Sequence, residues 1–205
     1  MPSPMQSSTL QYYAYWKQYY VFLKENEPKV LTQLYIEKLF RNQVPVIWNL
    51  QHLSELLGVK ISTLGHMISK PHAFYRHFEI PKRQGGSRQI SAPQPVLLEA
   101  QRWIKLHILQ ELPLHPAAKG FRRQQSICSN AAPHLGRPYL LKMDLKNFFP
   151  SISMHRVISV FRHLGYSEKV AYALAALCCS RQALPQGAAS SPDLSNHIAR
   201  RWMPG

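Results

Sequence analysis

The sequence predicts an α+β fold in which a helical region is followed by a hairpin, a short strand and further helices. Three observations lead to this prediction. Apolar residues recur at helical spacing in several segments, a Gly-Gly turn separates two strand-like stretches within residues 77–91, and an apolar run at 139–143 leads into an aspartate. The chain has 205 residues, of which 45% are hydrophobic, so it is long enough to bury a sizeable core. We expect one large domain or two small lobes.

The first 70 residues are predicted to be helical. We expect helices over residues 9–24 and 30–40, and a pair of short helices within 50–68 around Gly58. Such a pair is compatible with a helix-turn-helix reader of DNA, and also with two helices that pack on the next lobe. The packing interpretation is the simpler one, and we favour it.

A basic β-hairpin is predicted at residues 77–91, because its Gly-Gly pair supplies the positive φ angles that tight turns need. The hairpin carries the cations Lys82, Arg83 and Arg88. A helix is expected to follow, with Pro95 at its start. One side of that helix is apolar and is predicted to be core: Val96, Ala100, Trp103, Ile104, His107 and Ile108.

The apolar run at 139–143 predicts a buried strand that delivers Asp144 at its carboxyl end. Two amphipathic helices are expected after it, each starting with a serine cap, at Ser153 and at Ser167. Their predicted buried positions are Met154, Val157, Ile158, Phe161 and Leu164 in the first helix, and Val170, Leu174 and Leu177 in the second.

The chain is strongly basic. Lysine and arginine number 25 against 10 aspartates and glutamates, which gives a net charge of +15. Residues 1–70 hold 7 basic and 4 acidic side chains, whereas residues 71–205 hold 18 and 6. An excess of this size indicates a polyanionic partner such as nucleic acid, bound mainly by the second part of the chain.

Neither a secretory signal nor a membrane span is predicted, because the N-terminus lacks a basic region followed by an apolar stretch and no run of 18 apolar residues occurs. We therefore expect a cytoplasmic protein. The three cysteines, Cys128, Cys178 and Cys179, lack the paired spacing of a zinc site. They are predicted to be reduced and mostly buried.

Asp144 is the candidate catalytic residue. The chain has two aspartates, Asp144 and Asp193, and Asp144 lies in the apolar setting MDLKNFFPSI. A carboxylate buried there would require a positive partner. A metal ion is one such partner, and a structural salt bridge or a helix cap is the alternative.

Four motifs in order resemble the polymerase site of retron and related bacterial reverse transcriptases. They are FEIPKRQGGSRQISAP, GFRRQQSICSNAAPH, LKMDLKNFFPSI and LPQGAASSPDLSN, which together cover roughly residues 75–198. The segment from Asn130 to His134 is similar to the Asn-Ala-x-x-His pattern that distinguishes retron enzymes from group II intron relatives. The alternative is that these residues have no role in binding: Asn130 would start a turn, and His134 would be a surface residue.

The resemblance implies the fingers and part of the palm of a right-hand polymerase. In that frame residues 1–70 form the helical N-terminal region, residues 71–138 the fingers, and residues 139–205 a partial palm with an incomplete sheet. The thumb domain is expected to be absent from these residues.

The resemblance also implies roles for single residues. Asp144, with the Leu145 carbonyl, would coordinate the two Mg²⁺ ions of the intact enzyme. Lys82 and Arg88 would grip the triphosphate of the incoming dNTP. Phe149 would stack under its sugar and exclude a 2′-hydroxyl, although a plain core phenylalanine is the alternative. The loop residues that would pack against the nucleotide and template base are Gln186 and Gly187.

Further residues are candidates for contacts with the nucleic acid. Template phosphates are the expected partners of Arg83, Arg122 and Arg123, because such cations position a strand without reading its bases. The matches to the retron pattern, Asn130 and His134, belong to the same group of candidates.

The family supplies further carboxylates from a downstream Tyr-x-Asp-Asp hairpin, and these 205 residues contain no adjacent aspartates. The ending HIARRWMPG also departs from the family, where something like Ala-Arg-Arg-Leu-Asp-Ala-Arg follows. This departure indicates a frameshift near Arg201, and a split enzyme with a second polypeptide is the alternative. Either way, we expect the chain alone to be inactive.

The implied function is that of a retron reverse transcriptase, an RNA-directed DNA polymerase. Such an enzyme copies a structured noncoding RNA into multicopy single-stranded DNA, starting from an RNA 2′-hydroxyl, and serves antiphage defence with an effector protein. A group II intron-like reverse transcriptase is an alternative within the family. A non-catalytic nucleic-acid-binding module would explain the charge but not the ordered motifs.

Overall fold

The computed structural model of the chain describes residues 30–82, 85–122 and 125–200. The predicted helix at 9–24, the cations Arg83 and Arg123, and the tail from Arg201 lie outside these residues. The described helices are α2 (Val30–Arg41), α3 (Leu50–Leu57), α4 (Ile61–Ser69), η2 (Pro71–Phe74), α5 (Pro95–Ile104), the π-helical η3 (Lys105–Leu109), α6 (Ile127–Ala131), η4 (Ala132–His134), α7 (Phe148–Ser151), α8 (Met154–Leu164), α9 (Glu168–Cys178) and α10 (Ser191–Ala199). The strands are β1 (Tyr75–Pro81) and β2 (Ser87–Pro93).

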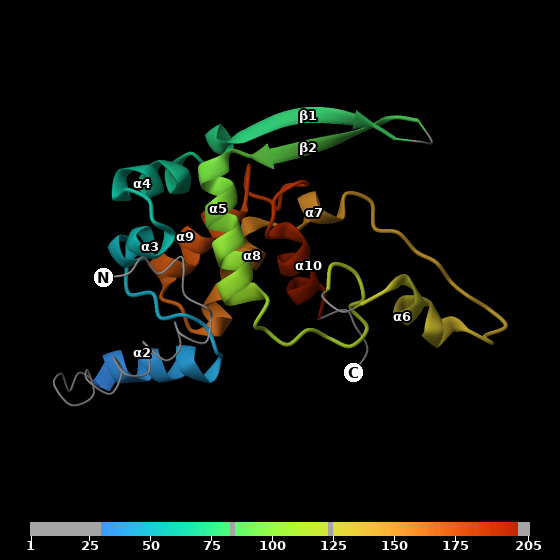
Figure 1. The fold of residues 1–205 in the computed structure, drawn as a ribbon, viewed down its shortest axis with the longest axis horizontal. Helices are drawn as coiled ribbons and strands as arrows, with labels where there is room; N and C mark the ends of the chain where they lie inside the picture. The colour runs from blue at the N-terminus through green and yellow to red at the C-terminus, as the bar shows by residue number, and fades with distance from the viewer. Residues whose placement is uncertain (1–29, 83–84, 123–124, 201–205) are drawn as a thin grey trace.

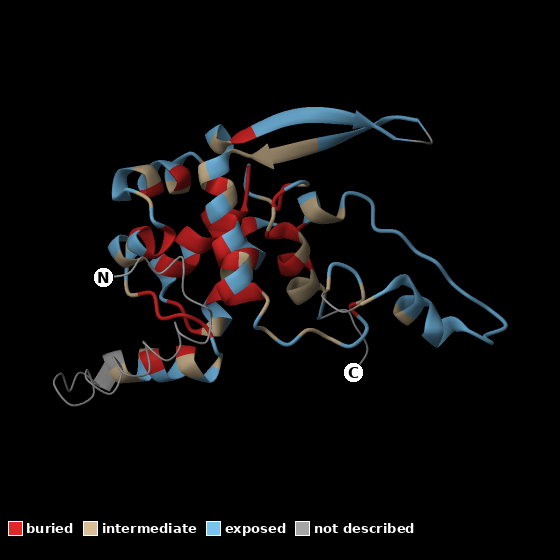
Figure 2. Cartoon of the chain, viewed as in Figure 1, coloured by how far each residue is buried: buried red, intermediate tan, exposed pale blue. Residues whose placement is uncertain are grey.

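The mixed helix and strand content agrees with the predicted α+β class. The helices pack into one body with α5 in front in this view, and the β1–β2 hairpin extends from one end of this body (Figure 1). Between η3 and α7 the chain leaves the body and forms an extended arm beside it, which contains the short α6 (Figure 1). We refer to residues 125–147 as the arm. Buried residues gather in the helical body, whereas most of the hairpin and the arm is exposed (Figure 2).

Helix α9 forms the centre of the core. It packs against α8, α4, α5 and α3, and eight of its eleven residues are buried. A helix that is apolar on all sides can be stable only where other helices cover every side. Cys178, in its last turn, and the adjacent Cys179 are buried, and burial raises the pKa of the Cys178 thiol to about 12. Cys128 in the arm is exposed.

The predicted helix pair within 50–68 is confirmed as α3 and α4. Asn49 caps α3 by accepting a hydrogen bond from the His52 amide at 2.9 Å, and Gly58 ends the helix with a φ of 65°. The apolar sides face the body, where α3 packs on α5 and α4 packs on α9. These contacts support the packing interpretation. The buried apolar residues of the pair are Leu53, Leu56, Leu57, Leu64 and Met67.

The helices predicted after Pro95, Ser153 and Ser167 are also confirmed, as α5, α8 and α9. Ser153 and Ser167 stand at the N-cap positions, but neither side chain makes a capping hydrogen bond. The two serines therefore located these helix starts correctly, but the expected hydrogen bond from a backbone amide to the serine hydroxyl is not formed.

The predicted strand at 139–143 is wrong for this structure. The segment has no regular secondary structure, and its apolar side chains are exposed, with Tyr139 at 91% and Met143 at 81%. A strand needs neighbours for its backbone groups. Among the described residues the one sheet is the β1–β2 pair, and it does not include this segment.

A single cluster of buried residues joins the parts of the chain. It contains residues from α2 through α10 and therefore draws on all three predicted regions, 1–70, 71–138 and 139–205. The boundaries of these regions stay predictions. Among the described helices, none has the length and apolar character required to cross a membrane.

Gln101 links three parts of this body through its buried side chain. Its Nε2 atom donates to the Tyr75 hydroxyl at 2.7 Å and to the Leu177 carbonyl at 2.8 Å. Its Oε1 atom accepts from the Ala189 amide at 3.1 Å. The base of the hairpin, the last turn of α9 and the loop before α10 are thus held by one amide group. Because Leu177 lies at a helix end, its carbonyl has no partner in the following turn, and Gln101 supplies one.

We expect Gln101→Leu to lower the free energy of unfolding by about 3 kcal/mol, because it leaves the Leu177 carbonyl and the Ala189 amide without their partner. Urea unfolding followed by fluorescence measures this loss. The matched control is Gln51→Leu on the exposed face of α3, which should stay within about 0.5 kcal/mol of the parent. Equal stability of the Gln101 variant and the parent would contradict the prediction.

Candidate functional site

The predicted basic hairpin is present and has two unlike faces. Its strands pair in antiparallel register, with Ile80 opposite Arg88 and Phe78 opposite Ile90. Side chains alternate between the faces of a strand, so these four residues share one face, which we call the Arg88 face. The opposite face is polar, and on it Gln89 donates to Glu79 at 3.4 Å.

The hairpin turn depends on its two glycines. Gly85 and Gly86 have φ angles of 86° and 79°, which a residue with a Cβ adopts only at a cost. The turn closes with a hydrogen bond of 3.0 Å from the Lys82 amide to the Gly86 carbonyl. Lys82 therefore lies beside the tip of the hairpin, and both Lys82 and Arg88 are exposed.

The loop at 184–190 packs directly on the hairpin. The Ser91 amide donates to the Gln186 carbonyl at 2.8 Å. At Gly187, whose φ is 117°, an added Cβ would lie 2.9 Å from Ile90 Cγ2 and 2.9 Å from the Ser91 carbonyl oxygen. Because Ile90 Cγ2 belongs to the Arg88 face, the loop and Arg88 lie on the same side of the hairpin. The absence of a side chain at Gly187 is required for this close approach.

A tight turn leads into that loop. Ser180 and Ala183 bond to each other in both directions, at 2.9 and 3.1 Å, while Arg181 and Gln182 between them have φ angles of 48° and 64°. Positive φ at both central positions is the geometry of a type I′ turn, which usually contains asparagine and glycine. Arg and Gln adopt it here at an energetic cost.

The same turn binds the chain that follows Phe149. The Leu184 amide donates to the Ile152 carbonyl at 3.0 Å, and the Met154 amide donates to the Gln182 carbonyl at 2.8 Å. The half-buried Phe149 ring lies 6.0 Å from the Phe148 ring, centre to centre. The structure thus brings the element that carries Phe149 to the start of the loop that carries Gln186. It also gives Phe149 core contacts, as its alternative interpretation expects.

Asp144 and Leu145 lie apart from this assembly. Both are exposed and belong to the arm, shortly before α7. The apolar setting that suggested a buried carboxylate is present in the sequence but does not enclose Asp144 in this structure. No hydrogen bond or ion pair described for the chain joins Asp144 to the hairpin or to the loop.

The other predicted nucleic-acid contacts also lie mostly in the arm. Asn130 is in α6 and His134 ends η4, and both are exposed. Asn130 is therefore a helical residue and does not start a turn. Arg122 is partly buried and lines a small cavity of about 220 Å³ that Asp193 also lines. Asp193 itself is buried, and its Oδ2 lies 3.4 Å from Lys105 Nζ.

The described residues do not by themselves form a Mg²⁺ site. No group of three or more His, Cys, Asp or Glu side chains gathers within them, and Asp144 stands exposed in the arm. Mg²⁺ prefers oxygen ligands, and a pair of ions requires several of them. Asp144 can contribute one carboxylate to such a site.

Gln101 is the positioning residue that the sequence interpretation missed. Leu97, Gln101, Ile104 and Ile108 follow each other at helical spacing, so Gln101 occupies a core position of α5. A lone uncharged polar residue at such a position predicts a buried group with hydrogen-bond partners. The sequence therefore contained the signal for a buried polar group, but it did not identify the hydrogen-bond partners of Gln101.

We expect Gly187→Ala to destabilise the chain by about 2 kcal/mol or more, because it adds a collision with Ser91 to the strain of a positive φ. Gly136→Ala is the matched control, since Gly136 has a φ of 69° but no atom within 4 Å of an added Cβ. It should cost about 1 kcal/mol. Urea unfolding of both variants tests the contact, and equal losses would show that the collision does not exist.

Comparison with known proteins gives the family. The family model for reverse transcriptase (RNA-dependent DNA polymerase) matches residues 80–202, which is more than half of the chain. Retron Ec86 reverse transcriptase of Escherichia coli is 36% identical over 160 residues, which cover 77% of this chain and 50% of that protein. For retron Mx65 reverse transcriptase of Myxococcus xanthus the identity is 36% over 186 residues, covering 80% and 44%.

Retron Mx162 reverse transcriptase of Myxococcus xanthus is 33% identical over 184 residues, which cover 79% of this chain and 38% of that protein. The chain thus spans half or less of the length of these relatives. The region matched by the family model begins near the end of β1 and includes β2, Asp144, the loop at 184–190 and α10. The chain therefore belongs to the reverse transcriptase family, as a retron-type member.

Proposed function

We propose that this chain supplies the fingers and part of the palm for RNA-directed DNA synthesis by a retron reverse transcriptase. The observation that carries the proposal is the contact of the loop at 184–190 with the hairpin, on the side that bears Arg88. This contact brings together two elements that the family resemblance assigns to the incoming nucleotide. In this role the chain binds dNTPs, an RNA template-primer and the DNA product.

In this proposal the hairpin and the loop contact different parts of the nucleotide. Arg88 and Lys82 lie at or near the hairpin tip and offer a guanidinium fork and an ammonium group to the triphosphate. Gln186 lies where the loop meets β2, and in this proposal its side chain would contact the base or the template strand. Phe149 is tied to the same loop through Ile152, and its ring would limit the space beside the sugar.

The arm would deliver the catalytic carboxylate. Residues 139–145 are apolar apart from Lys142 and Asp144, yet Tyr139, Leu141 and Met143 are at least 80% exposed. Exposed apolar surface of this extent is typical of a segment that another element covers. We therefore propose that other parts of the polymerase cover this segment. Asp144 would then face Mg²⁺ together with further carboxylates, including those of a Tyr-x-Asp-Asp hairpin.

The wider role follows from the retron relatives. The reaction would copy a structured noncoding RNA into multicopy single-stranded DNA in the cytoplasm, with an effector protein as partner in antiphage defence. Asn130 and His134 lie on the exposed outer part of the arm, where an RNA can reach them. The cations Arg83, Arg122 and Arg123 are the further candidates for strand contacts.

A non-catalytic nucleic-acid-binding role is the second candidate. The exposure of Asp144 and the lack of a metal-binding cluster among the described residues favour it. The two roles differ in what Asp144 does, because binding through phosphates does not need this carboxylate.

We expect Asp144→Asn to abolish DNA synthesis in an enzyme that joins this segment to a Tyr-x-Asp-Asp hairpin, since an amide is a poor ligand for Mg²⁺. Primer extension on an RNA template measures the rate, which should fall by at least about 10³-fold if one ligand of the two-metal site is lost. Affinity for the template should stay within twofold of the parent, as a rough expectation.

Glu55→Gln is the matched control, because it makes the same chemical change on an exposed helix away from the site. It should leave extension unchanged. Normal synthesis by the Asp144 variant would remove the catalytic assignment and favour the binding module.

We expect the 205-residue chain alone, given Mg²⁺, dNTPs and a primed RNA template, to show no extension. The reason is that Asp144 has no carboxylate cluster beside it in the described residues. Gel analysis of labelled primers checks this. Robust extension would mean that the chain assembles a metal site from its own residues.

A further inference from the structure

A large cavity on the described residues lies away from the hairpin and the arm. It has a volume of about 1070 Å³ and is enclosed by the end of α2, the chain after η3, helix α8 and the end of α10. None of the residues proposed to bind the nucleotide or Mg²⁺ lines it. We call it the α8–α10 cavity.

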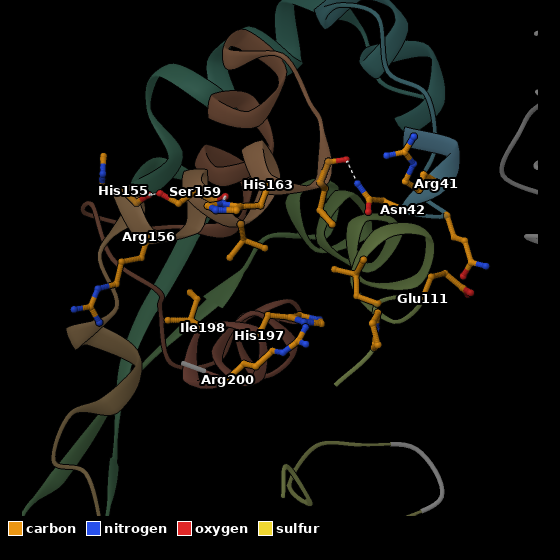
Figure 3. A pocket seen from close by; sticks show the side chains of 15 residues that line it. Arg41, Asn42, Glu111, His155, Arg156, Ser159, His163, His197, Ile198 and Arg200 are labelled. Atoms are coloured by element: carbon orange, nitrogen blue, oxygen red, sulfur yellow. Dashed lines mark hydrogen bonds between the residues drawn. The ribbon is translucent and has the colours of Figure 1, made fainter. Parts of the chain in front are cut away.

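The lining of the α8–α10 cavity is strongly basic. Three arginines reach it from three helices: Arg41 from α2, Arg156 from α8 and Arg200 at the end of α10. Three histidines, His155, His163 and His197, also line it, and Figure 3 labels these side chains. The lining contains a single acid, Glu111, which lies on the side of Arg41 (Figure 3).

The charge is concentrated on the wall formed by α8 and α10. That wall carries the cations Arg156 and Arg200, and no acidic residue of either helix lines the cavity. Burial lowers the pKa of His197, so the positive charge of the wall comes from the arginines. Asp193, the acid of α10, is buried and directed at Lys105. A concave surface lined by one sign of charge focuses its field and attracts a ligand of the opposite sign. The cavity therefore favours an anion.

The rest of the lining consists of neutral hydrogen-bonding side chains and of five apolar residues, Leu112, Pro113, Val160, Leu164 and Ile198. Asn42, Gln43 and Ser159 are present, and Asn42 is held by a hydrogen bond from its Nδ2 to the Leu164 carbonyl at 2.8 Å. Together with arginine, such groups are the usual partners of phosphate oxygens in nucleic-acid complexes. The lining contains no Phe, Tyr or Trp. It thus lacks the aromatic platforms on which proteins stack nucleobases.

From these features we propose that the α8–α10 cavity is a second nucleic-acid site, which holds the phosphate backbone of a strand without reading its bases. A volume of 1070 Å³ is at the upper limit of pockets for small ligands, and its arginines come from three separate helices. This arrangement suits successive phosphates of one strand better than a single small anion. Asp144 does not line the cavity, so the test of this proposal does not depend on whether the chain takes part in DNA synthesis.

The test compares two double charge reversals in the 205-residue chain. Arg156→Glu with Arg200→Glu removes two cations from the cavity. Arg162→Glu with Lys169→Glu is the matched control, because these exposed residues of α8 and α9 do not line the cavity, and the change in net charge is the same. The probe is a labelled oligouridine of fifteen nucleotides or so, whose bases offer little structure. Circular dichroism verifies that both variants are folded.

We expect the cavity variant to bind the oligonucleotide at least about tenfold more weakly than the parent at moderate salt. Its plot of log affinity against log salt should lose a slope of about 1.4, which corresponds to two phosphate contacts on a single strand. The control variant should retain most of the affinity. A DNA strand of the same length should behave in the same way, because backbone contacts tolerate both sugars.

Three results would overturn the proposal. Equal weakening by the cavity and control variants would mean that only the net charge matters. Unchanged binding by the cavity variant would mean that these cations serve contacts within the protein or with another protein. Complete displacement of the oligonucleotide by sodium triphosphate at equal phosphate concentration would indicate a site for a small anion.

Discussion

The arrangement of the candidate site depends on the side-chain amide of Gln101. This group is fully buried and bonds with Tyr75 at the base of the hairpin, Leu177 at the end of α9 and Ala189 in the loop before α10. A buried amide is stable only when its donors and acceptor are satisfied, and here each partner comes from a different element. The hairpin, the central helix and the loop are therefore fixed relative to one another by the same interaction.

That constraint explains why one half of the site is assembled and the other half is not. The hairpin and the loop meet through Ser91 and Gly187, close to Gln101, and the turn at 180–183 links them to the chain after Phe149. The segment that carries Asp144 has no such anchor and exposes its apolar side chains to solvent. The residues proposed to contact the nucleotide thus lie on elements held by the helical body, whereas Asp144, the proposed metal ligand, lies in a segment without such an anchor.

The sequence predicted those features that arise from local chemistry. The helices around Gly58 and after Pro95 follow from apolar spacing, and the hairpin follows from its Gly-Gly turn, because each of these signals lies within one segment. The strand at 139–143 could not be predicted reliably in the same way, because pairing depends on neighbours that are remote in sequence. The predicted serine caps show a similar limit, since the residue type does not determine where its hydroxyl points.

The role of Gln101 could not be predicted from the sequence for a related reason. Its partners lie 26, 76 and 88 residues away, so helical spacing could place it in the core without naming what it binds. Gly187 was predicted to pack against the nucleotide and template base, and the structure shows that the Ser91 backbone lies where a side chain at this position would project. Family resemblance drew attention to this loop, but the contact that positions it could be seen only in the fold.

The most direct test of this account is amide hydrogen exchange at Ala189 and Ser91, measured by NMR on the isolated chain. Neither amide takes part in the hydrogen bonds of a helix or of the β1–β2 pair. The Ala189 amide donates to the Gln101 side chain at 3.1 Å, and the Ser91 amide donates to the Gln186 carbonyl at 2.8 Å. The account predicts that both exchange only on global unfolding, with protection close to that of the α9 amides. Exchange of both at the rate of exposed loops would show that the hairpin and the loop are not held together.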